Sequence, residues 1–349
     1  MNSKSLLILA TSIRLFTAAR SLACDLCGCA MPDHPWEPRS GLYLGVSEQF
    51  TRYNKLQLDG HEIDNDARQF LDSSITQFLA GYNFAQSFGV QVNVPYIYRD
   101  FRRTAETRIQ EGTVSGLGDV SLLAHWMPIY RNTTDFTFRA RLIGGVKFPT
   151  GDSDRLKEEA EEGHTHGGHE EAAEKPAEPT HAEGEAEHHE EEPAEEATLP
   201  ESGIHGHDLA LGSGSIDGVI GVDFFVRWKR AFCAAEAQYA IRSKGDHDYR
   251  YANDFQWSGG PGVYVIERDD YTLSFQAVCS GETKGKDEFR GQKSEDTAVT
   301  AVFLGPKITG TWKDRISAGV ELAVPVDIDN SSLQAVPNYR VRGAISIAF

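Results

Sequence analysis

The last eleven residues, Tyr339-Arg-Val-Arg-Gly-Ala-Ile-Ser-Ile-Ala-Phe349, decide the fold of this chain. Successive side chains of a β-strand point to opposite faces, so this stretch separates into an apolar face and a mixed face. The first face carries Tyr339, Val341, Gly343, Ile345, Ile347 and Phe349. The second carries Arg340, Arg342, Ala344, Ser346 and Ala348. The pattern predicts a terminal β-strand with one apolar surface.

The same period of two recurs along the chain in twelve segments of about ten residues. They are 42–53, 73–84, 88–101, 118–129, 135–148, 217–228, 231–244, 254–267, 271–279, 298–312, 316–326 and 339–349. Twelve is even, as single-chain bacterial outer-membrane barrels require. The aromatic C-terminus resembles the terminal strand of such barrels, which the barrel-assembly machinery of that membrane recognises. The sequence therefore predicts that the C-terminal strand binds the barrel-assembly machinery.

The connections between these segments alternate in length. The short ones are 85–87, 130–134, 229–230, 268–270 and 313–315. The long ones are 54–72, 102–117, 149–216, 245–253, 280–297 and 327–338. Outer-membrane barrels alternate short periplasmic turns with long outer loops. The sequence thus predicts an all-β fold, a closed antiparallel transmembrane β-barrel of about 12 strands over 41–349. We expect the protein to lie in the outer membrane of a Gram-negative-type bacterium, in contact with membrane lipid and with both termini in the periplasm.

The first residues indicate export. Lys4 precedes an apolar run, and Ser21-Leu22-Ala23 forms a small-x-small exit, so 1–23 is a predicted signal peptide. Residues 24–40 form a predicted periplasmic segment with Cys24, Cys27 and Cys29. These thiols fit either a disulfide or a metal site, and lipidation of Cys24 is a further alternative.

Most of the excess negative charge lies in one insert. Between Asp152 and Gly203 stand 19 acidic and three basic residues, which account for 16 of the 18 excess negative charges. The rest of the chain is nearly neutral, which argues against nucleic acid as a partner. The insert is rich in Ala, Glu, Pro and Gly, and it shows no strand period, so we expect 152–203 to be a disordered outer loop.

The insert and the residues directly after it hold eight of the twelve His residues: His164, His166, His169, His181, His188 and His189 within it, and His205 and His207 just beyond. Neutral imidazoles at short spacing are suitable ligands for Zn, Cu or Ni. The sequence therefore predicts divalent metal capture by the outer loop, although no cofactor is required for the barrel. The alternative is a solvated acidic brush.

Charged residues on the faces opposite the apolar ones would point into the lumen. They are Arg139, Arg141, Lys147, Arg227, Arg242, Arg340 and Arg342, with Asp119, Asp223, Glu236 and Glu321. The basic excess indicates a weak anion preference. The alternative is that these residues pair across the lumen as a structural ladder. A twelve-stranded barrel is compatible with either a plugged interior or a narrow channel.

Three motifs carry a resemblance. They are Gly116-Leu117-Gly118-Asp119, Lys147-Phe148-Pro149-Thr150-Gly151, and Leu211-Gly212-Ser213-Gly214 followed by Asp217. Together they resemble the outer-membrane transporter family associated with meta-pathway phenol degradation, which implies a barrel that passes small, often aromatic, molecules. The family's link between the last two motifs is much shorter than the insert in this chain. By their residue types alone, the Gly and Pro residues of these motifs mark bends and strand ends. Asp119 and Asp217 would either cap turns or form part of a ring at the pore mouth.

No enzyme motif is present: the chain has no Gly-x-Ser-x-Gly, no Walker loop and no His-Glu-x-x-His. We therefore predict a non-enzyme, an outer-membrane channel or facilitator for a small solute, aromatic or hydrophobic if the resemblance holds. Two alternatives remain open at this point: a non-conducting structural or adhesive barrel, and a porin linked to Zn, Cu or Ni acquisition or efflux.

Overall fold

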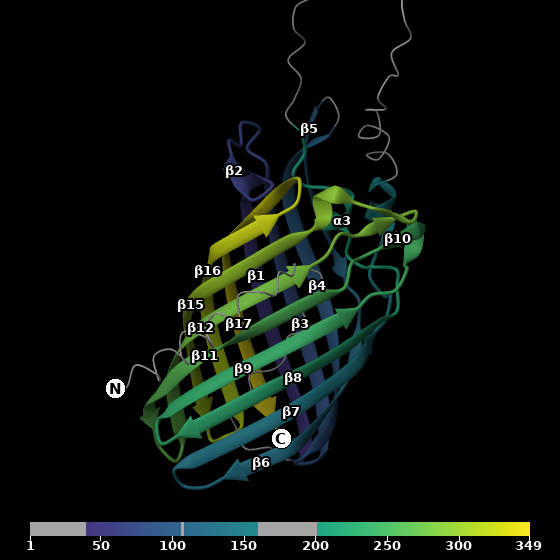
Figure 1. Cartoon of the computed structure of the whole chain (residues 1–349). Helices are drawn as coiled ribbons and strands as arrows, with labels where there is room; N and C mark the ends of the chain where they lie inside the picture. The colour runs from purple at the N-terminus through teal and green to yellow at the C-terminus, as the bar shows by residue number, and fades with distance from the viewer. Residues whose placement is uncertain (1–39, 106–107, 160–200) are drawn as a thin grey trace, which may run out of the picture.

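The computed structural model describes residues 40–105, 108–159 and 201–349. One antiparallel sheet dominates it and curls into a barrel (Figure 1). Its strands are β1 (Gly41–Leu58), β3 (Phe70–Ala85), β4 (Phe88–Ala105), β5 (Arg108–Leu117), β6 (Ser121–Asn132), β7 (Phe136–Lys147), β8 (Asp217–Trp228), β9 (Ala231–Ile241), β11 (Asp254–Glu267), β12 (Tyr271–Lys284), β15 (Val299–Trp312), β16 (Ile316–Asn330) and β17 (Leu333–Ala348).

Strands β5 and β6 share one position in the barrel, because both pair with β4, one after the other. The barrel thus has twelve strand positions. Strand β17 closes it by pairing antiparallel with β1, from Tyr43 opposite Ala348 to Leu58 opposite Leu333. A closed sheet has no free edge, so its backbone donors and acceptors are satisfied within the wall. The predicted fold is confirmed.

Short elements gather at the end of the barrel that carries the long connections (Figure 1). They are β2 (His61–Ile63), η3 (Asp154–Lys157), α3 (Gly206–Leu209), η4 (Asp246–Asp248), β10 (Tyr249–Arg250), β13 (Glu288–Phe289), β14 (Gln292–Lys293) and η5 (Glu295–Thr297). We call this end the outer mouth. The brief turns and the C-terminus lie at the opposite end. Among the described residues, no helix is long and apolar enough to cross a membrane.

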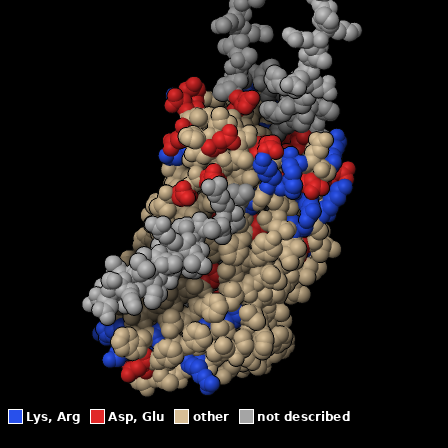
Figure 2. All heavy atoms as spheres, in the orientation of Figure 1, with Lys and Arg blue, Asp and Glu red and all other residues tan. Residues whose placement is uncertain are grey.

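The outer wall carries large apolar side chains at alternate positions. Leu44 on β1, Phe78 on β3, Ile220 on β8 and Ile308 on β15 are all at least 42% exposed. Their sequence neighbours face inward and are more buried. In Figure 2, one side of the barrel shows a broad band with few charges between charged ends. An exposed apolar surface of this extent is stable against lipid and not against water.

Several strands extend further toward the outer mouth than the sequence pattern predicted. Residues 102–105, 108–117 and 327–338, expected to be loops, instead belong to the β4–β5 and β16–β17 hairpins. Beyond the apolar band, the outward side chains become polar, as in the ion pairs Arg102–Glu111 and Lys55–Glu62. The alternation of apolar and polar residues is lost there, although backbone pairing continues. This loss is why the segments ended too early.

Candidate functional site

Two segments of the long connection between β7 and β8 fold inward and pack against the inner wall near the outer mouth. We call these segments, 150–159 and 201–216, the plug. Leu156, Ile204 and Leu209 are fully buried, and Leu211 is nearly so. Because these residues are apolar, their burial stabilises the plug inside the barrel.

Three small apolar clusters attach the plug to its surroundings. Ile204 and Leu209 pack against Leu71 and Phe101 on the inner wall. Leu211 packs against Ile75 and Ile97. Leu156 and Ala210 pack against Tyr249 and Tyr251. The plug is therefore part of the folded barrel.

This arrangement corrects the predicted limits of the insert. The sequence placed all of 152–203 in a disordered outer loop, but 152–159 and 201–203 are described, and Leu156, Glu159 and Gly203 are buried. The backbone of Gly203 also accepts a hydrogen bond from Ala335 on β17 (2.7 Å). The middle of the insert, 160–200, lies outside the described residues.

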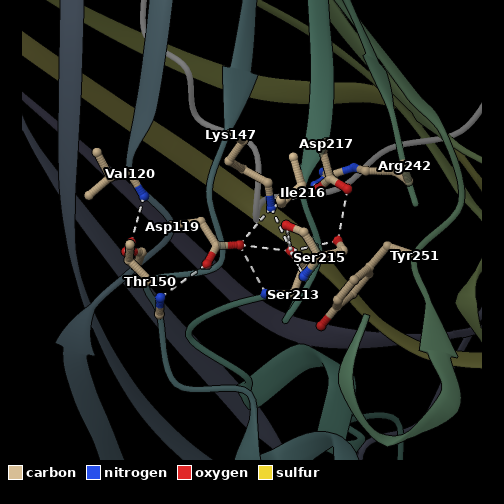
Figure 3. Close-up of polar contacts among 12 residues, drawn as sticks. Asp119, Val120, Lys147, Thr150, Ser213, Ser215, Ile216, Asp217, Arg242 and Tyr251 are labelled. Carbon is tan, nitrogen blue, oxygen red and sulfur yellow. Dashed lines mark hydrogen bonds and ion pairs between the residues drawn. The ribbon is translucent and has the colours of Figure 1, made fainter. Parts of the chain in front are cut away.

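The three sequence motifs meet at the base of the plug (Figure 3). The Lys147 ammonium lies 2.7 Å from Oδ2 of Asp119 and 3.0 Å from Oδ2 of Asp217. The hydroxyl of Ser213 donates to Oδ2 of Asp119 (2.8 Å), and the backbone N–H of Gly151 donates to its Oδ1 (3.0 Å). Asp119 therefore caps backbone of the plug and also pairs with a cation.

A second cation extends this network toward the next strands. The Arg242 guanidinium donates to Oδ2 of Asp217 (2.8 Å) and to Oδ2 of Asp254 (2.7 Å). Ser215 donates from its hydroxyl to Oδ1 of Asp217 (2.7 Å). All these charged side chains are buried. Three carboxylates and two cations thus join β7, β8, β9 and β11 to the plug, and each buried charge has a partner of opposite sign.

Two glycines allow the motif backbones to touch. A Cβ built on Gly212 would lie 2.6 Å from the carbonyl carbon and oxygen of Gly151. A Cβ on Gly151 would lie 2.6 Å from the carbonyl oxygen of Leu211. Only residues without a Cβ fit such close contact between two backbones.

Below the plug, the lumen contains a cavity of about 150 Å³. Its inward-facing lining consists mainly of amides, hydroxyls and charged side chains: Ser47, Gln49, Gln77, Glu236, Gln238, Gln256, Ser258, Ser280, Glu282, Lys307, Ser317, Glu321, Arg340, Arg342 and Ser346. The charges are largely paired. Arg340 forms a two-bond fork with Glu282 (2.6 and 2.8 Å), and Arg342 lies 3.3 Å from Glu321. The surface offered to a solute is therefore part polar and part apolar, and its basic and acidic side chains balance.

A smaller cavity of about 90 Å³ adjoins β7, β8, β9 and β11. Arg139 and Arg141 both approach the carboxylate of Asp223, Arg139 at 3.6 Å and Arg141 through a hydrogen bond. The Arg139 guanidinium also lies over the ring of Phe225, 5.5 Å from its centroid. Two cations share one carboxylate here.

The structure brings most of the predicted lumen charges into pairs. Arg227 pairs with Glu267 (2.6 Å), and Ser258 donates to Glu236 (2.9 Å). These contacts favour the structural-ladder alternative over the predicted anion preference. Sequence reasoning missed Arg99 and Arg103, although both share the inward parity of Phe101. Arg99 donates to the carbonyl of Ala210 in the plug (2.7 Å), and Arg103 pairs with Glu158 (2.6 Å).

Two predicted metal-binding residues, His205 and His207, lie in the plug and are at most 7% exposed. Nδ1 of His207 lies 3.0 Å from Oε1 of Glu159, and its Nε2 lies 3.4 Å from Oδ1 of Asp208. Burial lowers the pKa of His207, but the two carboxylates outweigh burial and raise it to about 10. Burial also raises the pKa of Glu159, yet the charge and hydrogen bond of His207 bring it down to about 2.

The other predicted ligands lie outside the described residues. They are Cys24, Cys27, Cys29, His164, His166, His169, His181, His188 and His189. Their metal or disulfide chemistry, like the limits of the signal peptide, stays a prediction. The correction concerns His205 and His207 alone, which belong to the buried plug and not to an outer loop, because the apolar residues around them attach this segment to the inner wall.

Comparison with known proteins bears on the fold. Neither a protein-family model nor a curated protein sequence matches the chain. Among solved structures, an outer-membrane channel from Pseudomonas putida F1 is similar, with a TM-score of 0.55 over 91% of this chain and 99% of that chain, at 11% identity. The β domain of the Bordetella autotransporter BrkA has a TM-score of 0.43 over 89% and 100%, also at 11% identity.

The likeness to the Pseudomonas channel shows a shared barrel fold. The association with meta-pathway phenol degradation, which rests on the three sequence motifs, stays a prediction.

Proposed function

We propose that this protein is an outer-membrane channel for a small, polar and mostly uncharged solute. The observation that carries the proposal is the cavity of about 150 Å³ inside a barrel whose outer wall is apolar. A passage for solute requires internal space of this kind, whereas an anchor does not depend on it. Amides and hydroxyls around the cavity can replace the hydration of a polar solute.

The pairing of the lumen charges supports the choice of solute class. An ion passing Arg340 or Arg342 meets a carboxylate beside each cation, so neither sign of charge gains much. A neutral polar molecule loses little from this arrangement. The aromatic or hydrophobic solute implied by the sequence resemblance is the competing proposal. It requires an apolar path, and the inward-facing apolar side chains of this cavity, Ile75, Leu79 and Ala344, stand among amides, hydroxyls and charges.

Uptake into liposomes tests the proposal. Purified protein is reconstituted, and the entry of a small neutral sugar, a small amide and an aromatic acid is compared. We expect the neutral polar solutes to enter fastest. No uptake of any solute above that of protein-free vesicles would favour the structural or adhesive barrel, and fastest entry of the aromatic acid would favour the competing solute class.

A matched pair of variants on β12 ties uptake to the cavity. Ser280 faces inward and lines the cavity, whereas Ala277 is exposed on the outer wall. Ser280→Trp should therefore slow uptake several-fold, and Ala277→Trp should leave it unchanged. Both variants are checked for heat-resistant migration of the folded barrel. Equal uptake by the two variants would show that solute does not pass this cavity.

We also propose that the outer mouth faces the cell exterior and that the short turns face the periplasm. The support is the alternation of connection lengths, with the C-terminal strand ending at the short-turn side. Protease added to intact cells should cut within 160–200 and leave the strands protected. Cutting of this segment only after lysis would reverse the orientation.

A further inference from the structure

A cluster of two buried His side chains and a partly exposed Asp lies in the plug, around α3. It comprises His205, His207 and Asp208, whose candidate ligand atoms all lie within 4.8 Å of one another. His205 directly precedes α3, and the other two lie within it. A fourth group, Asp296 in η5, places Oδ2 3.2 Å from Nδ1 of His205. The cluster therefore joins the plug to the connection between β12 and β15.

The separations within this cluster match the edges of a metal coordination shell. Zn–N and Zn–O bonds of about 2.0–2.2 Å at tetrahedral angles place neighbouring ligand atoms roughly 3.3 Å apart. The two short separations here, His205–Asp296 and His207–Asp208, are 3.2 and 3.4 Å. Nδ1 of His205 is buried and forms no hydrogen bond with Asp296, despite their proximity. Ligand atoms directed at a common ion, and not at each other, have this geometry.

The groups behind the ligand atoms are placed as metal sites require. Nδ1 of His207 faces Glu159 at 3.0 Å, which leaves Nε2 on the side of Asp208. A carboxylate behind a ligating imidazole fixes the ring and its tautomer. Oδ2 of Asp208 accepts the backbone N–H of His205 (3.0 Å), so its Oδ1 remains on the side of His207. Both His207 and Asp208 are thus oriented from behind.

The charge of the cluster also favours a cation. Asp208, Asp296 and Glu159 bring three carboxylates around two imidazoles, with Glu159 buried and the other two partly exposed. A divalent cation bound among them would balance this negative charge.

We propose that the plug binds one divalent ion of the Zn²⁺ class through His205, His207 and Asp208. Nitrogen and carboxylate ligands suit Zn²⁺. The ion fixes α3, and the contact of Asp296 with His205 connects the site to η5. The site lies in the plug, whereas the cavity of the proposed passage is lined by other residues.

Zn²⁺ titration of the full chain tests the site. The insert His residues could also bind metal, so the reference protein carries Gln at His164, His166, His169, His181, His188 and His189. Calorimetry then counts bound ions, and Co²⁺ absorption reports tetrahedral coordination. Adding His205→Gln and His207→Gln should remove one bound ion and the tetrahedral Co²⁺ signal. Adding His61→Gln and His247→Gln, which lie outside the cluster, should remove none.

A second variant guards against loss of fold. Glu159→Gln retains all proposed ligands and removes only the carboxylate behind His207. It should lower Zn²⁺ affinity by about 10- to 100-fold without changing the number of bound ions. Heat-resistant migration confirms that each variant is folded. An unchanged ion count in the His205 and His207 double variant, or an unchanged affinity in folded Glu159→Gln, would overturn the proposal.

Discussion

The Lys147 ammonium on β7 lies between the carboxylates of Asp119 and Asp217, 2.7 and 3.0 Å away. Each of these residues belongs to a different sequence motif, and all three side chains are at most 5% exposed. Through these two ion pairs, Lys147 at the end of β7 is joined to Asp217 at the start of β8 and to Asp119, which lies just before β6. Its removal would leave an excess of buried negative charge.

Lys147→Met should destabilise the barrel by about 3–5 kcal/mol, the usual cost of breaking a buried ion pair. The measurement is denaturant unfolding in detergent, followed by heat-modifiable migration. Lys244→Met is the control, because that lysine pairs with Asp248 at the surface, and there we expect no measurable change. Equal stability of the two variants would mean that the buried network adds nothing to the fold.

The contact between Gly151 and Gly212 gives a second prediction. Gly212→Ala would place a Cβ 2.6 Å from the backbone of Gly151, so the plug must shift. We expect faster cleavage by trypsin after Arg155 and Lys157, which lie in η3. Gly144→Ala is the control, since a Cβ at Gly144 would contact nothing within 4 Å. Cleavage at the control rate would show that the plug tolerates the added methyl group.

The fold was predictable from sequence because lipid imposes one simple rule on the outer wall. Alternate residues such as Ile220 and Phe224 must be apolar over the width of the membrane, and this rule produces the period of two. Parity also indicates which side chains face inward. It does not indicate which of them meet. Arg340 and Glu282 form a fork between β17 and β12, 58 residues apart, and no local pattern records that pairing.

The plug was not predictable for a different reason. Ile204 and Leu209 lie in a segment with no strand period, and their burial depends on Leu71 and Phe101, far away in sequence. The composition of the insert grouped His205 and His207 with six other His residues. Only the packing of α3 separates these two from the others. Compositional reasoning therefore singled out these two His residues but did not place them in the plug.

Two deletions test the corrected limits of the insert. Replacing 160–200 by a short Gly-Ser linker should leave heat resistance nearly unchanged, because loop-closure entropy depends weakly on length. Replacing 153–200 should lower it, since Leu156 is fully buried and Glu158 pairs with Arg103. The loss of Leu156 alone would cost about 2–5 kcal/mol, as large-to-small changes in cores do. Equal heat resistance of both deletion variants would show that η3 does not stabilise the barrel.

The shared carboxylate of Asp223 gives the last prediction. Arg139→Gln combined with Arg141→Gln removes both cations near it, so the cavity beside β7 and β8 becomes negative. If ions pass this part of the lumen, the reversal potential in a KCl gradient should shift toward cation preference. Adding Asp223→Asn to the same protein should reverse most of the shift, because the charges that still line this cavity, Glu236 and Lys307, then balance. A shift that persists in the triple variant would come from altered structure and not from charge. No shift in the folded double variant would place the ion path away from Asp223.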